Sequence, residues 1–273
     1  MPNETGGRAP AAPAAGAATH PVPLDANTFV GPFPFREIPH PDPDVLVRVM
    51  DREGIARAWV GDLPGAFHRD PSPSNARLAA ALVPFRDRLL PAPIVRPDWP
   101  RWREGVDEAA ASGARVVRAY PQLWGMGVGD GRLADLAAAC AGHGLAVVLT
   151  VRFEDLRQRH PLDVAPDLSA AHVRELARAG TGARLVVTAA GRELIEETHW
   201  GLTPDERSRL FFDFSWLWGP PSDELALLFR TIGSERFIYG TMWPLRLTQG
   251  ARANLALLPD ELSSSPLADP GAW

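Results

Sequence analysis

Short apolar runs alternate with longer amphipathic stretches along most of the chain, from about residue 24 to about residue 259. Repeated units of this kind, one strand followed by one helix, are typical of a parallel sheet covered by helices. The pattern predicts eight strands, at residues 24–30, 56–63, 89–95, 114–120, 145–152, 184–189, 210–216 and 236–241. It predicts a helix after each strand, at residues 44–53, 74–85, 99–112, 131–143, 169–179, 192–198, 222–232 and 248–257.

Local residues at several helix ends support this pattern. Gly54, Gly113 and Gly144 follow predicted helices, where a left-handed residue often ends the helix. Ser169 and Ser222 precede predicted helices and are suited to cap them. Eight units in about 235 residues favour a closed barrel over an open, doubly wound sheet. The predicted fold class is α/β, a single (β/α)8 TIM barrel with a disordered N-terminal tail.

An open, doubly wound sheet that binds a nucleotide would have a glycine-rich turn after its first strand. The sequence has no G-x-G-x-x-G after a strand and no P-loop. The run at 125–129, Gly-Met-Gly-Val-Gly, follows Tyr120-Pro121 and is interpreted as a loop between a strand and a helix.

Composition changes at both ends of the barrel region. Residues 1–22 are rich in Ala and Pro without a continuous apolar segment, which predicts a disordered tail and not a secretory signal. Residues 23–260 form the predicted barrel, and the Ser- and Pro-rich residues 261–273 are expected to form a flexible C-terminal tail. No apolar run approaches the roughly 20 residues that span a bilayer, so no membrane association and a cytoplasmic location are expected.

Charge and composition exclude several classes of function. The net charge is -5 and the arginines are scattered, so nucleic acid is not an expected ligand. All 28 basic residues are arginine, which excludes a Schiff-base lysine, a lysine general base and a carbamylated-lysine metal bridge. The single cysteine, Cys140, lies in an alanine-rich helix and is expected to pack in the core.

Ligand-binding groups in such barrels follow the C-terminal ends of the strands, and arginines recur at these positions. Because side chains alternate along a strand, Arg118 and Tyr120 share one face near the barrel mouth. Converging arginines would suit bidentate capture of a carboxylate. The predicted substrate-binding residues are Asn27, Arg118, Tyr120, Arg152, Arg157, Trp243 and Arg246. Structural ion pairs, such as Arg152 with Glu154 or Arg157 with Asp155, are the alternative, and the tryptophans after strands alternatively cap the barrel.

Carboxylates and histidines near strand ends are the candidates for proton transfer. The predicted catalytic residues are Glu154, His160, Asp213 and Asp25, with Asp62 a further carboxylate at a strand end. Only His68 and His160 among the seven histidines lie in loops after strands, and a structural or solvated role is the alternative for both. Ser215 lacks the G-x-S-x-G context of a serine nucleophile.

The chain resembles the amidohydrolase-related TIM-barrel proteins over about residues 25–258. Three stretches carry the resemblance: the segment from Asp25 to Gly31 with the following Pro-Phe-Pro-Phe-Arg, the loop 152–162, and the segment 236–244. Metal-binding proteins of that superfamily place histidines and an aspartate where this sequence has Asn27, Phe29, Thr150 or Arg152, Ala189 and Met242. Because Phe and Ala cannot ligate a metal, the resemblance implies a degenerate metal site and no cofactor.

The resemblance therefore implies a metal-independent hydrolase or carbon–carbon lyase, decarboxylase-like, that acts on a small carboxylated molecule. The alternative is an inactive pseudoenzyme that binds an anionic small molecule or a protein partner. A third hypothesis rebuilds a metal site from Asp25, Asn27, Asp62 and Asp213. Barrels of this type often pair, and the apolar loop Phe33-Pro34-Phe35 would suit a homodimer contact.

Overall fold

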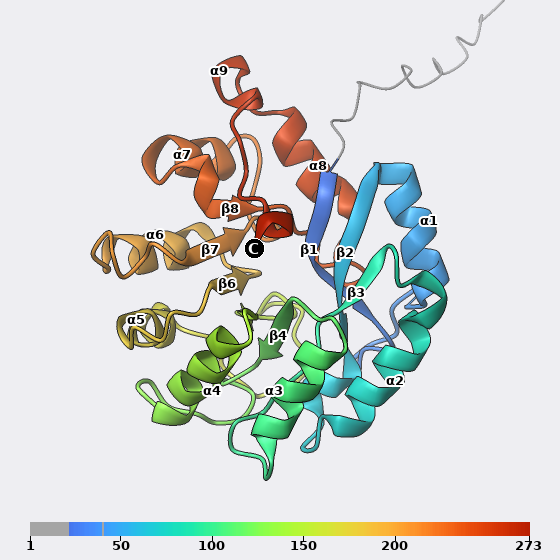
Figure 1. Cartoon of the computed structure of the whole chain (residues 1–273). Helices are drawn as coiled ribbons and strands as arrows, with labels where there is room; N and C mark the ends of the chain where they lie inside the picture. The colour runs from blue at the N-terminus through green and yellow to red at the C-terminus, as the bar shows by residue number, and fades with distance from the viewer. Residues whose placement is uncertain (1–21, 40) are drawn as a thin grey trace, which may run out of the picture.

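The strands close into a barrel with the helices outside it (Figure 1). The computed structural model describes residues 22–39 and 41–273. All neighbouring strands are parallel, in the orders β1-β2-β3 and β4-β5-β6-β7-β8, and two isolated bridges, Ile94 with Arg118 and Thr28 with Trp243, close the two seams. The strands are β1 (Val22–Val30), β2 (Ile55–Asp62), β3 (Leu89–Pro91), β4 (Val116–Ala119), β5 (Ala146–Thr150), β6 (Leu185–Thr188), β7 (Leu210–Asp213) and β8 (Phe237–Ile238). The predicted (β/α)8 barrel is confirmed; the N-terminal tail predicted for residues 1–22 lies, except for Val22 in β1, outside the described residues.

A helix follows each strand, as predicted. The helices are α1 (Pro43–Glu53), α2 (Ser72–Leu82), α3 (Trp102–Ala111), α4 (Gly131–Gly142), α5 (Ala170–Arg178), α6 (Arg192–Trp200), α7 (Glu224–Thr231) and α8 (Thr248–Ala256), with a short α9 (Asp260–Ser263). Gly54 ends α1 in the left-handed conformation that the sequence suggests, at φ 64°. Ser169 is the N-cap residue of α5, as predicted, but its hydroxyl is hydrogen-bonded to the Nδ1 of His172 and not to a backbone N–H. The cap predicted at Ser222 is wrong, because Asp223 is the N-cap residue of α7.

Several strands are shorter than predicted because the chain leaves the ladder early at the C-terminal end of the barrel. Ala189 follows β6 at φ 57° and Met242 lies beyond β8 at φ 63°, and neither conformation belongs to an extended strand. In β3 the ladder ends at Pro91, and Pro93 also lacks an N–H, so only Ile94 rejoins the sheet as an isolated bridge. These departures place irregular backbone around the barrel mouth.

The core has two main layers, one inside the barrel and one between the strands and the helices. The inner layer contains Leu24, Trp59, Val116, Val148 and Ile238, all buried. The outer layer is larger and includes Cys140 of α4, whose pKa is raised by burial to about 12, so that its thiol stays protonated. No helix in the described part of the chain is long and apolar enough to cross a membrane.

The C-terminal residues cover the end of the barrel where the strands begin. Trp273 packs its ring 6.0 Å from Trp59 and 4.7 Å from Phe211, and the N–H of Ala268 donates to the carbonyl of Phe237 at 2.9 Å. In Figure 1 the last short turn lies across the middle of the ring of strands. The sequence predicts a flexible tail from residue 261 and does not predict these contacts. With this end covered, the opposite end remains for ligands.

Candidate functional site

A cluster of buried polar side chains lies inside the barrel near the C-terminal ends of the strands. We call it the inner cluster, and it contains Asp25, Asn27, Arg118, Thr150, Asp213 and Ser215. Four of the side chains that the sequence predicts as functional residues are among them. β1 supplies Asp25 and Asn27, β4 supplies Arg118, and β7 supplies Asp213.

Asp213 holds this cluster together. Its Oδ2 accepts hydrogen bonds from the side-chain amide of Asn27 and from the hydroxyl of Ser215, both at 2.8 Å. Its Oδ1 accepts from the backbone N–H of Ala189 at 2.8 Å. A Cβ on Gly240 would lie 2.6 Å from Oδ2 of Asp213, so only glycine leaves room for this carboxyl group. Burial raises the pKa of Asp213, and these hydrogen bonds lower it in part.

Asp25 joins β1 to the segment after β8. Its Oδ1 accepts from the backbone N–H groups of Asn27 at 3.0 Å and Thr241 at 3.1 Å, and its Oδ2 accepts from the Thr241 hydroxyl at 2.6 Å. Burial raises the pKa of Asp25 to about 7, although the three hydrogen bonds favour the carboxylate. A carboxyl group that titrates near neutral pH can donate or accept a proton.

Arg118 crosses the barrel mouth from β4 and is fully buried. Its Nη1 donates to the Oδ1 of Asn27 at 3.3 Å and to the hydroxyl of Thr150 at 3.4 Å, and its Nη2 donates to the carbonyl of Thr28 at 3.4 Å. Its Cζ lies 4.3 Å from the centre of the Phe29 ring. Burial lowers the pKa of Arg118, but a guanidinium stays protonated in proteins. The cluster therefore contains a permanent positive charge.

Aromatic rings cover the inner cluster. We call this group the aromatic plug; it consists of Phe29, Phe33, Phe35, Phe67, Tyr120 and Phe153. Phe153 lies at its centre, with ring-to-ring distances of 5.7 Å to Phe29, 5.2 Å to Phe67 and 5.5 Å to Tyr120. Burial raises the pKa of Tyr120, so its phenol stays neutral. The plug separates Arg118 from solvent.

A pocket of about 220 Å³ lies outside the plug, and we call it the rim pocket. Its lining combines three arginines, two carboxylates and three aromatic rings: Arg36, Phe153, Glu154, Asp155, Arg157, Gln158, Trp216, Trp218, Leu245 and Arg246. Arg246 places its Cζ 4.4 Å from the Trp216 ring and 5.4 Å from the Trp218 ring. Among the residues that the structure describes, Arg246 has no carboxylate within 4.0 Å, whereas Glu154 pairs with Arg36 and Asp155 pairs with Arg157.

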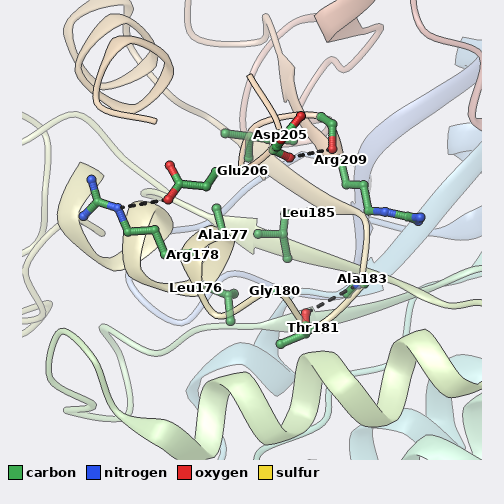
Figure 2. A pocket seen from close by; sticks show the side chains of 13 residues that line it. Leu176, Ala177, Arg178, Gly180, Thr181, Ala183, Leu185, Asp205, Glu206 and Arg209 are labelled. Carbon is green, nitrogen blue, oxygen red and sulfur yellow. Dashed lines mark hydrogen bonds and ion pairs between the residues drawn. The ribbon is translucent and has the colours of Figure 1, made fainter. Parts of the chain in front are cut away.

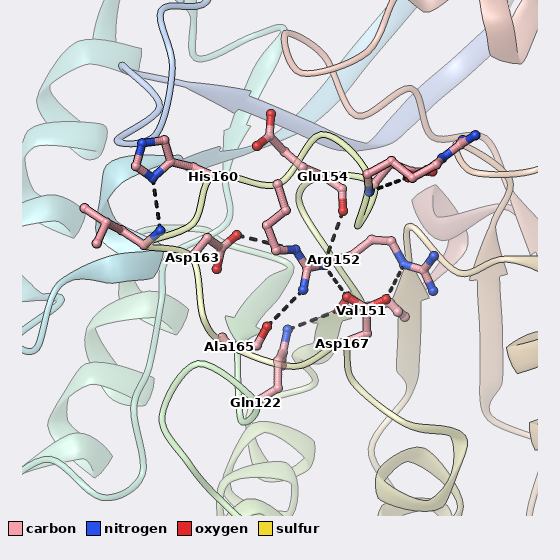
Figure 3. Close-up of polar contacts among 12 residues, drawn as sticks. Gln122, Val151, Arg152, Glu154, His160, Asp163, Ala165 and Asp167 are labelled. Carbon is pink, nitrogen blue, oxygen red and sulfur yellow. Dashed lines mark hydrogen bonds and ion pairs between the residues drawn. The ribbon is translucent and has the colours of Figure 1, made fainter.

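The loop after β5 supplies much of this rim and is held by ion pairs (Figure 3). Nε of Arg152 lies 3.0 Å from Asp167, and Arg159 pairs with both Asp167 and Asp163. Arg157 and Asp155 form the ion pair that the structural alternative predicts. Arg152 instead pairs with Asp167, and Glu154 pairs with Arg36 at 2.5 Å. Arg36 was not identified from the sequence as a site residue, since it precedes Glu154 by more than a hundred residues.

Other predicted residues lie outside the inner cluster and the lining of the rim pocket. His160 is exposed, stacks on Phe35 at 5.8 Å and accepts a hydrogen bond from the Leu162 N–H (Figure 3). The Trp243 side chain packs in the layer between barrel and helices, and its backbone pairs with Thr28 of β1 to close the barrel. His68 pairs with the hydroxyl of Ser74, away from the inner cluster. The structure therefore does not bring His160 or Trp243 to the inner cluster.

A further hollow, of about 300 Å³, lies at the opposite end of β6 and β7 (Figure 2). Its lining includes Arg178, Thr181, Asp205 and Arg209, and the Arg178 guanidinium lies 3.9 Å from Glu206. Since the hollow lies where these strands begin, it is distant from the end of the barrel that carries the inner cluster.

Comparison with known proteins gives matches of structure but not of sequence. No protein-family model matches the chain, and no curated protein matches it. The 5-carboxyvanillate decarboxylase of Novosphingobium aromaticivorans, solved with manganese and a nitrobenzoic acid, has a TM-score of 0.68 at 12% identity, covering 94% of this chain and 97% of that one. The 2,6-dihydroxybenzoate decarboxylase from Rhizobium has a TM-score of 0.65 at 13% identity, covering 90% and 96%.

A putative amidohydrolase from Staphylococcus aureus gives a similar result, with a TM-score of 0.66 at 10% identity and coverage of 92% of this chain and 98% of that one. At these identities the similarity establishes the fold alone, a barrel that this chain shares with the two decarboxylases and the putative amidohydrolase. The resemblance that the sequence suggests is therefore confirmed at the level of the fold.

The manganese in one neighbour raises the question of whether the inner cluster fits a metal. No group of three or more His, Cys, Asp or Glu side chains suited to a metal occurs within residues 22–39 and 41–273. Asp25 and Asp213 each accept three hydrogen bonds. Asp62 forms an ion pair with Arg77, with 2.6 Å between Oδ2 of Asp62 and Nη2 of Arg77. The four residues of the third hypothesis thus do not form one metal-binding set. The donors do not fit a divalent metal.

Proposed function

From the fold that this chain shares with amidohydrolase-related barrels, we propose that it is a metal-independent hydrolase or decarboxylase-like carbon–carbon lyase acting on a small carboxylated molecule. The observation that carries the proposal is Arg246, a partly buried guanidinium between two tryptophans with no carboxylate within 4.0 Å among the described residues. An aromatic carboxylate matches this site, because its ring can stack on tryptophan while the carboxylate pairs with the guanidinium.

The charge of the rim pocket supports an anionic ligand. Arg36, Arg157 and Arg246 face only two carboxylates, Glu154 and Asp155, so the lining has an excess of one positive charge. Burial lowers the pKa of Arg246, which indicates that its charge is poorly solvated. A bound carboxylate would compensate it. Glu154 and Asp155, each already paired with an arginine, then hold the arginines in place.

The inner cluster supplies groups suited to the chemistry. Arg118 can stabilise a developing negative charge on the substrate, and Asp213 can transfer a proton. In a decarboxylation, the carbon–carbon bond breaks, its electron pair stays on the substrate carbon, and the proton of the Asp213 carboxyl group replaces the carbon dioxide. In a hydrolysis, water would attack the scissile carbon as its bond to the leaving group breaks, the same carboxyl group would protonate the leaving group, and the proton released by the water would restore the carboxyl group. Asp25, whose oxygens hold Thr241 and Asn27, would position β1.

Access to the inner cluster depends on Phe153. This side chain lines the rim pocket and also belongs to the aromatic plug. It packs on Phe29, and Phe29 in turn lies against Arg118. Rotation of the Phe153 ring would connect the rim pocket with the guanidinium, so we assign it as the gate between binding and chemistry.

A second function, ligand binding without catalysis, is favoured by the aromatic plug itself. Phe29 occupies a position that carries a metal ligand in the metal-binding proteins that the sequence resembles, and it packs beneath Phe153. If the plug never opens, only the rim pocket can bind a ligand. Both functions share the carboxylate site, and turnover distinguishes them.

The carboxylate site is tested by replacing Arg246 with leucine. We expect the dissociation constant for 2,6-dihydroxybenzoate, measured by titration calorimetry, to rise about tenfold or more, as for loss of a hydrogen bond to a charged group. The control is Arg48→Leu on α1, which removes an exposed arginine of the same size outside the pocket. Equal affinity in the Arg246→Leu and Arg48→Leu proteins would contradict the site.

Catalysis is tested with purified protein and a series of benzoate derivatives, by following release of carbon dioxide and hydrolysis products. Loss of turnover in Asp213→Asn with binding retained supports the enzyme. Binding without turnover across the series supports the second function.

A further inference from the structure

We propose that the Arg118 guanidinium is a built-in cation that takes the place of a divalent metal in the barrel mouth, in a cage that would accept a free guanidinium ion. The proposal concerns how this fold is completed without a metal, and it does not depend on the proposed function. It rests on where the guanidinium lies, on the room made for it, and on the charges around it.

The Arg118 guanidinium lies beside positions that the resemblance assigns to metal ligands. On β1 these positions are Asn27 and Phe29, and on or just after β5 the position is Thr150 or Arg152. Nη1 of Arg118 lies 3.3 Å from the Asn27 amide oxygen and 3.4 Å from the Thr150 hydroxyl, and Cζ lies 4.3 Å from the Phe29 ring centre. A single cation thus contacts residues from β1 and β5, two of the strands at which the resemblance places metal ligands. The phenylalanine that cannot bind a metal offers its ring face to a guanidinium.

Gly61 of β2 makes room for the Arg118 side chain, which lies next to it. A Cβ at this position would lie 2.8 Å from Nε and 3.0 Å from Cδ of Arg118, and 3.0 Å from the Phe29 ring. Because any larger residue would collide with the arginine, the glycine creates the space that the guanidinium fills.

The positive charge of Arg118 is linked to a carboxyl group through the side-chain amide of Asn27. This amide accepts a hydrogen bond from Arg118 through its oxygen and donates one to Asp213 through its nitrogen. Burial disfavours the charged form of Arg118, whereas Tyr120, Asp213 and Asp25 favour it. Yet Arg118 has no carboxylate within 4.0 Å among the described residues, and its buried Nε has no hydrogen-bond partner there. The guanidinium is therefore held by a cage of neutral groups near two carboxyl groups, as a bound ion would be.

Removal of the side chain tests the cage directly. We expect Arg118→Ala to have a lower Tm than the unsubstituted protein and to regain part of it, saturably, in guanidinium chloride at millimolar concentration. Sodium chloride at the same ionic strength should give no such gain. The control is Met50→Ala, which opens a cavity of apolar lining in α1 and should not respond to guanidinium. A folded Arg118→Ala protein with no saturable gain would overturn the proposal.

A second variant keeps the proposal testable if Arg118→Ala does not fold. Gly61→Ala places a methyl group against Arg118, so we expect its Tm to fall by about 5 °C, as for an overpacked core site. Replacing Arg118 with valine removes the Cδ and Nε atoms that this methyl group contacts. We therefore expect the loss caused by Gly61→Ala to be smaller in the Arg118→Val background. Equal losses in both backgrounds would contradict the close fit.

Metal content provides an independent readout. After dialysis against manganese or zinc, elemental analysis of the unsubstituted protein should show no stoichiometric metal. One tightly bound ion per chain, lost in the Asp213→Asn variant, would show that the metal still binds beside Arg118 and would overturn the proposal.

Discussion

Replacing Phe153 with alanine should lower the free energy of unfolding by about 3–5 kcal/mol, the range for a large aromatic side chain removed from a core. Phe153 is 4% exposed and packs on Phe29, Phe67 and Tyr120. Its removal leaves a cavity above Arg118, because the neighbouring rings are fixed by one another. Urea unfolding measures the change.

A matched control lies in the same loop. Val164 is 86% exposed, and Val164→Ala should change stability by less than about 0.5 kcal/mol. If Phe153→Ala cost no more than Val164→Ala, the ring would not be part of a packed plug. The opened path should also increase the rate at which a benzoate probe reaches the inner cluster, seen in stopped-flow binding. An unchanged rate would contradict the assignment of Phe153 as the gate.

The barrel could be predicted from the sequence because its determinants are local. Each strand is a short apolar run and each helix has one apolar face, so eight repeats are visible without any long-range contact. The predicted strand boundaries are wrong where the chain leaves the ladder. The left-handed backbone at Ala189 and Met242 shortens strands that look longer in sequence, and these residue types do not signal it.

The site could be predicted only in part, because its contacts join distant residues. Period-two alternation predicts that Arg118 of β4 and Tyr120, just after this strand, share one face. Both side chains are buried near the barrel mouth. Alternation says nothing of depth, however, and Arg118 lies beneath the plug while Arg152 and Arg246 lie outside it. The three arginines thus do not converge on one cavity as the sequence suggested they could.

The sequence also does not predict which glycines lie against the side chains of the inner cluster. Gly61 and Gly240 make room for Arg118 and Asp213, but an isolated glycine in a strand has several explanations until its neighbour across the barrel is known. Asp25 and Thr241 are 216 positions apart. Local sequence patterns therefore do not predict that Asp25 joins β1 to the segment after β8.

The pH dependence of stability should change most when Asp25 is replaced with asparagine. Burial raises the pKa of Asp25 from 3.8 to about 7 in the folded protein. Between these values the folded state holds a proton that the unfolded state has lost, so the free energy of unfolding falls as pH rises. The loss is complete above about pH 7 and amounts to about 4 kcal/mol at 1.36 kcal/mol per pKa unit.

Asparagine imitates the protonated carboxyl group, since its oxygen can accept from the N–H groups of Asn27 and Thr241. Asp25→Asn should therefore match the unsubstituted protein near pH 4 and become the more stable of the two as pH rises to 8. Asp44→Asn is the control of opposite sign, because Arg48 lowers the pKa of that exposed carboxyl group in the folded protein. The Asp44 carboxylate therefore stabilises the fold only above the ordinary pKa of aspartate, and Asp44→Asn should lower the free energy of unfolding only there. Parallel stability curves for Asp25→Asn and the unsubstituted protein between pH 4 and 8, measured by urea unfolding, would show that Asp25 is ionised in the fold. The barrel interior would then hold the negative charge of Asp25 throughout this pH range, which is the arrangement that burial disfavours.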